Sequence, residues 1–325
     1  MLKRFLATAL ALAAAFPMAG VFAQDYPTKP VILIIPFAAG GPTDTLGRNL
    51  AVAMGKTLKQ QIIVENVPGA GGTISYAKVA KARPDGYTVL LAHIGMATAP
   101  ALYRKPAVNP LTDFEYIGQV ADVPMTLIAK KNLQPDNFKD FLAYFKANGK
   151  KMTYGNAGLG AASHLCGLLF MNAVKVDTQT VSYKGTAPAM NDLMGGHIDF
   201  MCDQTTNTTS QIKAGSVKVY AVTSAKSVPS LPGVPTLQEV GLKNFEVVVW
   251  HGLYLPKGTP KPVIDKLVSS LQAAVKDPDL KSKLAELGAE PVPVAKANPK
   301  ALQDHLKAEI NKWGPIIKAA GVYAD

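Results

Sequence analysis

Two segments of the chain combine small residues with hydroxyl or carboxyl side chains where an apolar run gives way to a helical pattern. The first is IPFAAGGPTD, residues 35–44, which supplies Thr43 and Asp44. The second is NAGLGAASH, residues 156–164, which supplies Ser163. Small residues let backbone N–H groups approach a ligand, and the helix N-terminus behind them adds a positive partial charge. The two segments therefore predict a pair of loops suited to a carboxylate or a phosphate.

Helix capping is the simpler interpretation of each of these side chains taken alone. Ser, Thr and Asp often accept a hydrogen bond from the first amides of a helix, and Thr43, Asp44 and Ser163 all stand at an expected helix start. Ligand binding becomes the better interpretation when the loops are taken as a facing pair. Neither loop is a nucleotide motif: the first lacks the Lys-Ser/Thr of a P-loop, and Ser163 replaces the third glycine of GxGxxG.

The sequence offers no catalytic set. Ser163 and His164 are adjacent, and neighbouring helical residues point apart, so they do not form a nucleophile and its base. A GxSxG segment is absent from the sequence. His93 ends an expected strand and could line a cleft. Asp203 ends the strand DFMCD, where it could orient a ligand hydroxyl or cap the following helix. We predict a protein that is not an enzyme, with a secreted α/β hydrolase acting on small acids as the alternative.

Cys166 and Cys202 are the two cysteines of the chain. Thiols 36 residues apart, without CxxC or HExxH, make a poor zinc signature. We therefore predict no metal site and no cofactor. An oxidising compartment would permit one disulfide between them, and the sequence leaves open whether it forms.

The N-terminal residues have the pattern of a secretory signal. Lys3 and Arg4 precede an apolar stretch, residues 5–15, and residues 21–23 are Val-Phe-Ala. The stretch is shorter than the roughly 20 residues that span a bilayer. We expect removal of residues 1–23, a mature start at Gln24 and a periplasmic location.

The composition of the remaining chain indicates a globular protein of about two domains. Without Lys3 and Arg4 the formal net charge falls from +11 to +9. The basic residues are spread singly and do not form a block, so we expect no nucleic-acid partner.

Short apolar runs alternate with helical patterns along the chain, which predicts parallel sheets covered by helices. Expected strands are residues 31–35, 61–65, 88–92, 125–130, 152–154, 180–183, 200–203, 217–223 and 247–255. Expected helices are residues 44–58, 137–148, 163–171, 188–195, 262–276, 278–287 and 299–319.

Clusters of Gly, Pro and other small residues follow several of these strands, at the edge of an α/β sheet where ligands bind. The clusters form two sets along the chain, which predicts two α/β lobes facing each other. We expect residues 24–124 with 246–325 in lobe 1 and residues 125–245 in lobe 2. The apolar runs at residues 119–131 and 247–258 are expected to be two strands crossing between the lobes.

Five segments resemble, in order and spacing, the Bug-type periplasmic solute-binding receptors of tripartite tricarboxylate transporters. They are YPTKPVILIIPFAAGGPTD, NVPGAGGTISYAKVAKARPDGYTVLLA, YGNAGLGAASHL, VSYKGTAPAMNDLMGGHIDFMCD and LPGVPTLQEVGL with WHGLYLPKGTP. The resemblance covers nearly all of the mature chain. It implies a two-lobed, type II-like periplasmic binding fold that closes over a small organic carboxylate, whether a di- or tricarboxylate, an amino acid or an aromatic acid.

The resemblance also implies a set of ligand-binding residues and partners. A departure at Ala161, where the family often has Ser or Thr, would favour an aliphatic or aromatic acid over a hydroxy acid. We expect a monomer that delivers its ligand to membrane permease subunits or reports it to a sensor kinase. The implied ligand-binding residues are Phe37, Ala39, Gly41, Thr43, Asp44, His93 and Gly95 in lobe 1, and Asn156, Ala162, Ser163, Thr186 and Asp203 in lobe 2.

Overall fold

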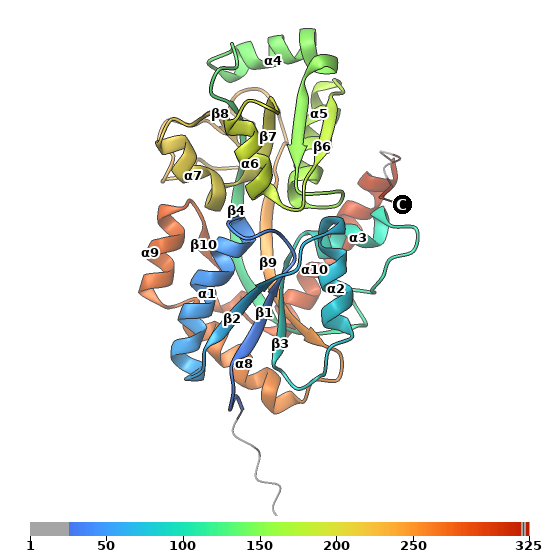
Figure 1. Cartoon of the computed structure of the whole chain (residues 1–325), viewed down its shortest axis with the longest axis vertical. Coiled ribbons are helices and arrows are strands. Elements are labelled where there is room, and N and C mark those ends of the chain that lie inside the picture. The colour runs from blue at the N-terminus through green and yellow to red at the C-terminus, as the bar shows by residue number, and fades with distance from the viewer. Residues whose placement is uncertain (1–25, 320, 322, 325) are drawn as a thin grey trace, which may run out of the picture.

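The computed structural model describes residues 26–319, 321, 323 and 324. The predicted signal, residues 1–23, and the predicted mature start at Gln24 lie outside the described residues. The described chain forms two α/β lobes, one above the other, with β4 and β9 running between them (Figure 1). No described helix is both long enough and apolar enough to cross a membrane.

Lobe 1 is built on a sheet with the strand order β2-β1-β3-β9-β4, and β10 pairs with β4. Its strands are β1 (Val31–Ile35), β2 (Ile62–Asn66), β3 (Thr88–His93), β9 (Val248–Pro256), β10 (Glu290–Pro291) and the first part of β4 (Phe114–Lys130). Its helices are α1 (Pro42–Leu58), α2 (Thr73–Ala80), α3 (Gly95–Leu102), α8 (Lys261–Ala274), α9 (Pro278–Glu286) and α10 (Pro299–Ala319).

Lobe 2 continues the same ladder with the order β4-β7-β5-β6, and β8 also pairs with β4. Its other strands are β5 (Thr153–Asn156), β6 (Gln179–Ser182), β7 (Phe200–Gln204) and β8 (Val217–Val222). Its helices are α4 (Phe138–Asn148), α5 (Ala162–Val174), α6 (Thr186–Met194) and α7 (Thr205–Lys213).

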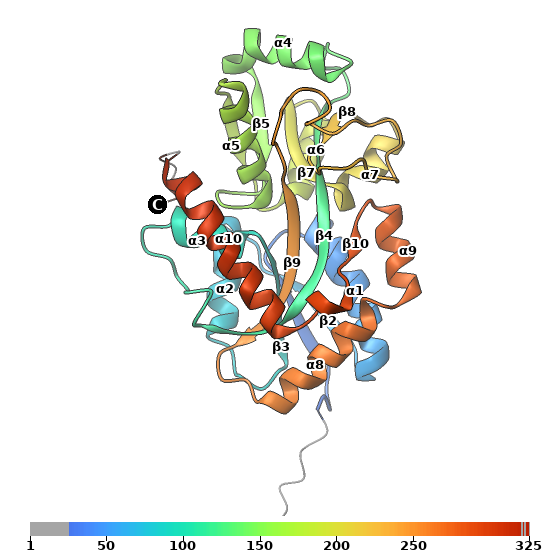
Figure 2. The same cartoon turned by 180° about the vertical axis from the view of Figure 1, so that it is seen from behind.

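Burial explains why the strands form where the apolar runs predict them. β1 is apolar throughout, β7 is apolar over Phe200–Cys202, and both strands are buried along nearly their whole length, as expected for strands covered on both faces by helices. Two large groups of buried apolar residues, one beneath α1 and α8 and one that extends between the lobes, form the core. Seen from behind, α10 packs along β4 and reaches α3 (Figure 2).

Both sheets are mixed, whereas the alternation of strands and helices indicated parallel sheets. β1 is parallel to β2 and β3, and β5 is parallel to β6 and β7, but β4 is antiparallel to β7, β8 and β9. β9 is also antiparallel to β3. The long strands enter each sheet from the other lobe, so they need no helical crossover and can run against their neighbours. The short elements α2, α3 and β10 were not expected from the sequence.

The passage between the lobes is narrow. β4 pairs with β9 up to Pro124 opposite Val248, and from Met125 onward it pairs with β7 and β8. The second connection lies beside the first, where the Val247 amide donates to the Thr223 carbonyl at 3.1 Å. Two adjacent backbone segments therefore carry the chain between the lobes; the residue bounds given above for the lobes stay a prediction.

Cys166 on α5 and Cys202 on β7 form a disulfide in the structure. Both residues are buried. Cys166 follows Ser163 by one helical turn and Cys202 directly precedes Asp203. The bond therefore ties together two elements that present predicted site residues.

Replacing both cysteines, in Cys166→Ala/Cys202→Ala, should lower the free energy of unfolding. The bond closes a loop with a sequence separation of 36, and the chain-entropy model assigns such a loop about 3–4 kcal/mol. Urea unfolding of oxidised wild-type protein, reduced wild-type protein and the variant measures the effect. Equal midpoints for the oxidised wild type and the variant would contradict the expected role of the bond.

Candidate functional site

The two lobes meet around a small cavity of about 10 Å³ at the ends of their strands. A cavity of this size holds about one water molecule. Larger hollows of about 320 and 540 Å³ lie on the flanks, between α1 and α9 and between α5 and α10. The small cavity is lined by Phe37, Pro42, Thr43, His93, Ala157, Ala161, Ala162, Ser163, Thr186, Asp203 and Gln204.

Four helices begin at this cavity: α1, α5, α6 and α7. A helix N-terminus presents backbone N–H groups without intrahelical acceptors and carries a positive partial charge. None of the four first turns is capped by the side chain of its N-cap residue. Three of those residues are Gly or Ala, which have no side-chain acceptor, although Ser, Thr, Asp and Asn are the usual choices. The N-cap residues are Gly41, Ala161, Gly185 and Gln204.

Glycines allow the loops of the two lobes to touch. Gly71 in lobe 1 has φ 60°, and a Cβ there would lie 2.0 Å from the Leu159 carbonyl oxygen of lobe 2. Gly185 in lobe 2 has φ 153°, and a Cβ there would lie 2.9 Å from the Ala38 nitrogen of lobe 1. The Ala38 amide donates to the Lys184 carbonyl at 3.1 Å. The structure thus shows the lobes in direct contact around the cavity.

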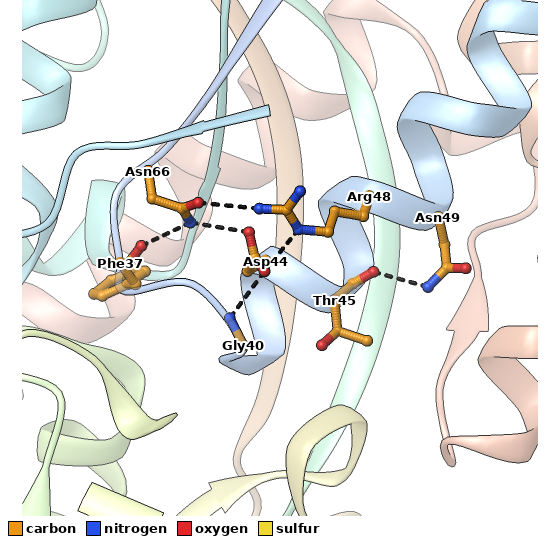
Figure 3. A network of polar contacts seen from close by, with 7 residues as sticks. All are labelled: Phe37, Gly40, Asp44, Thr45, Arg48, Asn49 and Asn66. Carbon is orange, nitrogen blue, oxygen red and sulfur yellow. Dashed lines mark hydrogen bonds and ion pairs between the residues drawn. The ribbon is translucent and has the colours of Figure 1, made fainter. Parts of the chain in front are cut away.

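Asp44 holds the first loop together (Figure 3). Its Oδ2 accepts hydrogen bonds from the Gly40 amide and Arg48 Nε, each at 2.9 Å, and its Oδ1 accepts one from Asn66 Nδ2 at 2.9 Å. Asn66 Nδ2 also donates to the Phe37 carbonyl. Burial would raise the pKa of Asp44, but these donors hold it below its ordinary value. The carboxylate is therefore ionised and engaged by the protein itself, and its contact with a ligand stays a prediction.

His93 presents a neutral donor at the lobe 1 wall. Its Nδ1 accepts a hydrogen bond from the Gly95 amide at 3.0 Å, which leaves the ring proton on Nε2. Phe37 stacks on the ring with centroids 4.7 Å apart. Burial lowers the pKa of His93 to about 4. Behind it, His251 Nε2 lies 3.4 Å from the Thr43 hydroxyl oxygen, which lines the cavity.

Ser163 and His164 shape the second loop and do not contact each other through a hydrogen bond. The Ala157 amide donates to Ser163 Oγ at 2.8 Å, and the Gly160 amide donates to His164 Nδ1 at 3.3 Å. Neither side chain caps α5. Each fixes the loop between β5 and α5, so this pair does not have the geometry of a nucleophile and a base.

Asp203 is a buried acid at the lobe 2 wall, with only 1% of its surface exposed. Its Oδ1 accepts a hydrogen bond from the Gln204 amide at 2.8 Å, and its Oδ2 accepts one from Asn207 Nδ2 at 2.6 Å. Burial raises the pKa of Asp203 to about 7, against the opposing effect of these two donors and of the nearby Thr186 hydroxyl. No Lys or Arg is among the described residues that line the cavity.

The structure brings seven of the twelve predicted ligand-binding residues into the cavity wall. Asp44, Gly41, Gly95 and Asn156 are buried behind it, and Ala39 is exposed at the outer rim. Sequence reasoning missed Pro42, Ala157 and Gln204, although each adjoins a predicted segment or residue. No group of three or more metal-binding side chains occurs within the described ranges. The seven residues are Phe37, Thr43, His93, Ala162, Ser163, Thr186 and Asp203.

Comparison with known proteins places this arrangement in a family. The model described as "Tripartite tricarboxylate transporter family receptor" matches residues 46–322. The structure is similar to that of the periplasmic binding protein BugD, with a TM-score of 0.90 and 54% identity over 92% of this chain and 99% of that one.

Two further solved structures contain ligands. MatC from Rhodopseudomonas palustris, with bound malate, has a TM-score of 0.86 and 36% identity over 90% of this chain and all of that one. Rpa4515 from R. palustris, with adipate, has a TM-score of 0.87 and 33% identity over 92% of this chain and 99% of that one.

The raised pKa of Asp203 predicts a pH-dependent stability. An ordinary Asp titrates near 3.9, so between about pH 4 and 7 the folded state holds a proton that the unfolded state releases. This contribution is complete below the unfolded pKa and is lost as the pH rises through 7. The difference in unfolding free energy between Asp203→Asn and wild type should therefore change in favour of the variant by about 2–3 kcal/mol as the pH rises from 5 to 8.

Asp199→Asn provides the matched control, because Asp199 directly precedes β7 and is ion-paired with Lys130 at 2.6 Å. Burial would raise its pKa, but hydrogen bonds from Lys130 and Thr153 lower it. Its difference from wild type should therefore stay constant over the same range. Urea unfolding at pH 5, 6, 7 and 8 measures all three proteins. A constant difference for Asp203→Asn would show that Asp203 is ionised throughout.

Proposed function

Because the chain belongs to the tripartite tricarboxylate transporter receptor family, we propose that it captures a small organic carboxylate between its lobes for delivery to a membrane permease. The observation that carries this proposal is the convergence of four N-termini, those of α1, α5, α6 and α7, on one cavity between the lobes. Their backbone N–H groups supply donors directed toward a common point.

Dipoles and hydrogen bonds replace a counter-charge at this site. Each helix N-terminus acts as about half a positive charge, and a hydrogen bond to a charged group contributes about 1.5–3 kcal/mol. The hydroxyl oxygens of Thr43, Ser163 and Thr186 line the same wall. Thr186 Oγ1 is buried and makes no well-formed hydrogen bond among the described residues, although it lies close enough to Asp203 to lower the pKa of that carboxyl. A hydroxyl placed in this way can donate to a ligand instead. An anion held without Lys or Arg can also be released readily.

Ligand entry requires the lobes to separate. A cavity of about 10 Å³ is too small for a dicarboxylic acid. Hydrogen bonds that join the lobes include Ala38 N to Lys184 O, Thr98 Oγ1 to Gly160 O at 3.0 Å, and Thr205 Oγ1 to Gly288 O at 2.9 Å. The paired passage at Pro124–Met125 and Thr223–Val247 is the place where a hinge would bend.

We assign to the site the reversible binding of a ligand, without conversion of that ligand. The cavity wall offers no nucleophile paired with a base, and His93 is neutral with its Nδ1 already accepting a hydrogen bond. We further propose that residues 1–23 direct export and that the mature protein acts as a periplasmic monomer. Its partner would be the permease that receives the ligand.

Titration of the mature protein with succinate, malate, adipate and aromatic acids tests this function. At least one acid should raise the melting temperature, because a ligand at a hundred times its Kd adds about 2.7 kcal/mol to the unfolding free energy. The acid should be recovered unchanged after incubation. Absence of binding by any carboxylate, or steady conversion of one, would overturn the proposal.

Thr186→Val should separate affinity from stability. The substitution removes an unpaired buried hydroxyl, so the ligand-free protein should be unchanged or up to about 1 kcal/mol more stable. Affinity for the carboxylate should fall by about 10- to 100-fold, because the ligand loses a charge-assisted hydrogen bond. Calorimetric titration and urea unfolding measure the two quantities.

Thr126→Val is the matched control, because the Thr126 hydroxyl is equally buried but donates to the Asp203 carbonyl and Thr208 Oγ1. This substitution should cost about 1 kcal/mol of stability and leave affinity within about twofold of wild type. Equal affinities for Thr186→Val and wild type would remove Thr186 from the binding site.

A further inference from the structure

The lobe 2 wall of the cavity presents acceptors that a carboxylate cannot satisfy. Gln204 is 3% exposed and lines the cavity, and its Oε1 is buried with no hydrogen-bond partner in the described part of the chain. The neighbouring Asp203 carboxylate also lines the cavity, and its oxygens accept hydrogen bonds from the Gln204 amide and Asn207 Nδ2 and interact with the Thr186 hydroxyl, which leaves part of their accepting capacity unused. A carboxylate oxygen can accept about two. Buried acceptors of this kind require a donor.

No protein cation supplies that donor. The titratable side chains around Asp203 are Tyr154 on β5, His164 on α5 and, across the cavity, His93 on β3. Burial lowers the pKa of both histidines and raises that of Tyr154, so all three are neutral near pH 7. The other elements that surround Asp203 present uncharged side chains, namely Thr43 on α1, Thr126 on β4, Thr186 on α6 and Asn207 on α7.

Donors for an anion lie in the same cavity. The first turns of α1, α5, α6 and α7 and the Thr186 hydroxyl are directed to one small space. A ligand carboxylate bound there lies close to Asp203, because Asp203 lines the same cavity as the four helix N-termini. Two like charges at such a distance repel strongly in a buried site, unless the ligand also presents a donor to Asp203.

We propose that the Asp203 carboxylate and Gln204 Oε1 form a donor-recognition subsite, which accepts hydrogen bonds from a hydroxyl or ammonium group next to the ligand's carboxylate. The protein then selects hydroxy or amino acids over unsubstituted acids. This inference rests on the proposed function and names its ligand class. The departure at Ala161 led us to expect a preference for aliphatic or aromatic acids over hydroxy acids, and the present inference reverses that preference. Ala161 lies with Phe37 and Ala157 in a small apolar cluster of the cavity wall.

Three acids with one four-carbon skeleton test the proposal: succinate, L-malate and L-aspartate carry hydrogen, hydroxyl and ammonium at the same carbon. Calorimetric titration at pH 7 should give malate or aspartate at least tenfold higher affinity than succinate. Titrations in two buffers of different ionisation enthalpy distinguish the two donors. An ammonium group stabilises the ionised form of Asp203, so binding of aspartate should release protons from Asp203 to the buffer. Binding of malate should release fewer protons.

Two variants locate the selectivity. Asp203→Asn keeps the shape of the side chain, and the Asn207 amide can turn so that its oxygen accepts a hydrogen bond from the new amide. The preference for malate and aspartate over succinate should fall at least tenfold, and the fall should be largest for aspartate. Gln204→Met removes the unpaired acceptor and replaces it with a side chain of similar size. The substitution should lower the affinity for malate and aspartate without lowering the affinity for succinate. Asp199→Asn, whose carboxylate is outside the cavity wall, should leave the three affinities unchanged.

The outcomes separate this inference from the function on which it rests. Equal affinity of wild-type protein for the three acids would overturn the donor subsite and leave carboxylate capture intact. Proton uptake with all three acids would also overturn it, because Asp203 would then be protonated and would donate to the ligand's carboxylate. If none of the carboxylates tested binds, the proposed function fails and this inference fails with it. The wild-type series decides the matter even if Asp203→Asn does not fold.

Discussion

Backbone amides at helix starts are the constraint on which the rest of this structure depends. Every helix leaves its first N–H groups without intrahelical acceptors, and most proteins satisfy some of them with a Ser, Thr, Asp or Asn side chain. Here four helices begin at one cavity, and Gly41, Ala161 and Gly185 are N-cap residues without a side-chain acceptor. The fold therefore concentrates donors at a point where a small anion can accept from several helices at once.

The surrounding polar side chains keep those amides in position and do not themselves need to touch an anion. Asp44 joins the first loop to α1 and to β2 through Gly40, Arg48 and Asn66 (Figure 3). Ser163 and His164 fix the second loop by accepting from its amides. The disulfide joins α5 to β7 behind the cavity. Rigid loops of this kind reduce the entropy that ligand binding would otherwise cost.

Several buried groups are less favourable for folding than apolar residues would be. Asp203 is buried without a cation, and Thr186 and Gln204 have side-chain atoms without a partner among the described residues. Unpaired buried polar groups each cost about 1–3 kcal/mol. They gather at the cavity between the lobes, where a bound solute would satisfy them. The arrangement links lobe closure to the chemistry of the ligand, because closure on an unsuitable solute leaves these groups unpaired.

The sequence by itself determined the elements and the small-residue loops between them. Apolar runs and turn residues predicted most strands within a few residues, since these patterns report on local geometry and burial, although β4 begins at Phe114 and not at residue 125. Thr43 and Ser163 were placed at helix starts and Asp203 at a strand end from their neighbours alone, and the structure puts all three in the cavity wall. The two sets of loops also predicted two lobes, and the resemblance to the receptor family added further residues and the type II-like binding fold.

Only the tertiary structure decided which groups face one another. Asp44 meets Asn66, 22 residues away, and Thr43 meets His251, 208 residues away. The sequence did not predict a binding role for Gln204. An uncharged amide indicates a ligand contact only when the folded structure leaves its oxygen without a hydrogen-bond donor. The two crossing strands were predicted, but the antiparallel direction of β4 and β9 was not, because strand direction depends on how the chain returns from the other lobe. Local patterns fix elements, whereas pairing between distant residues depends on their packing in three dimensions.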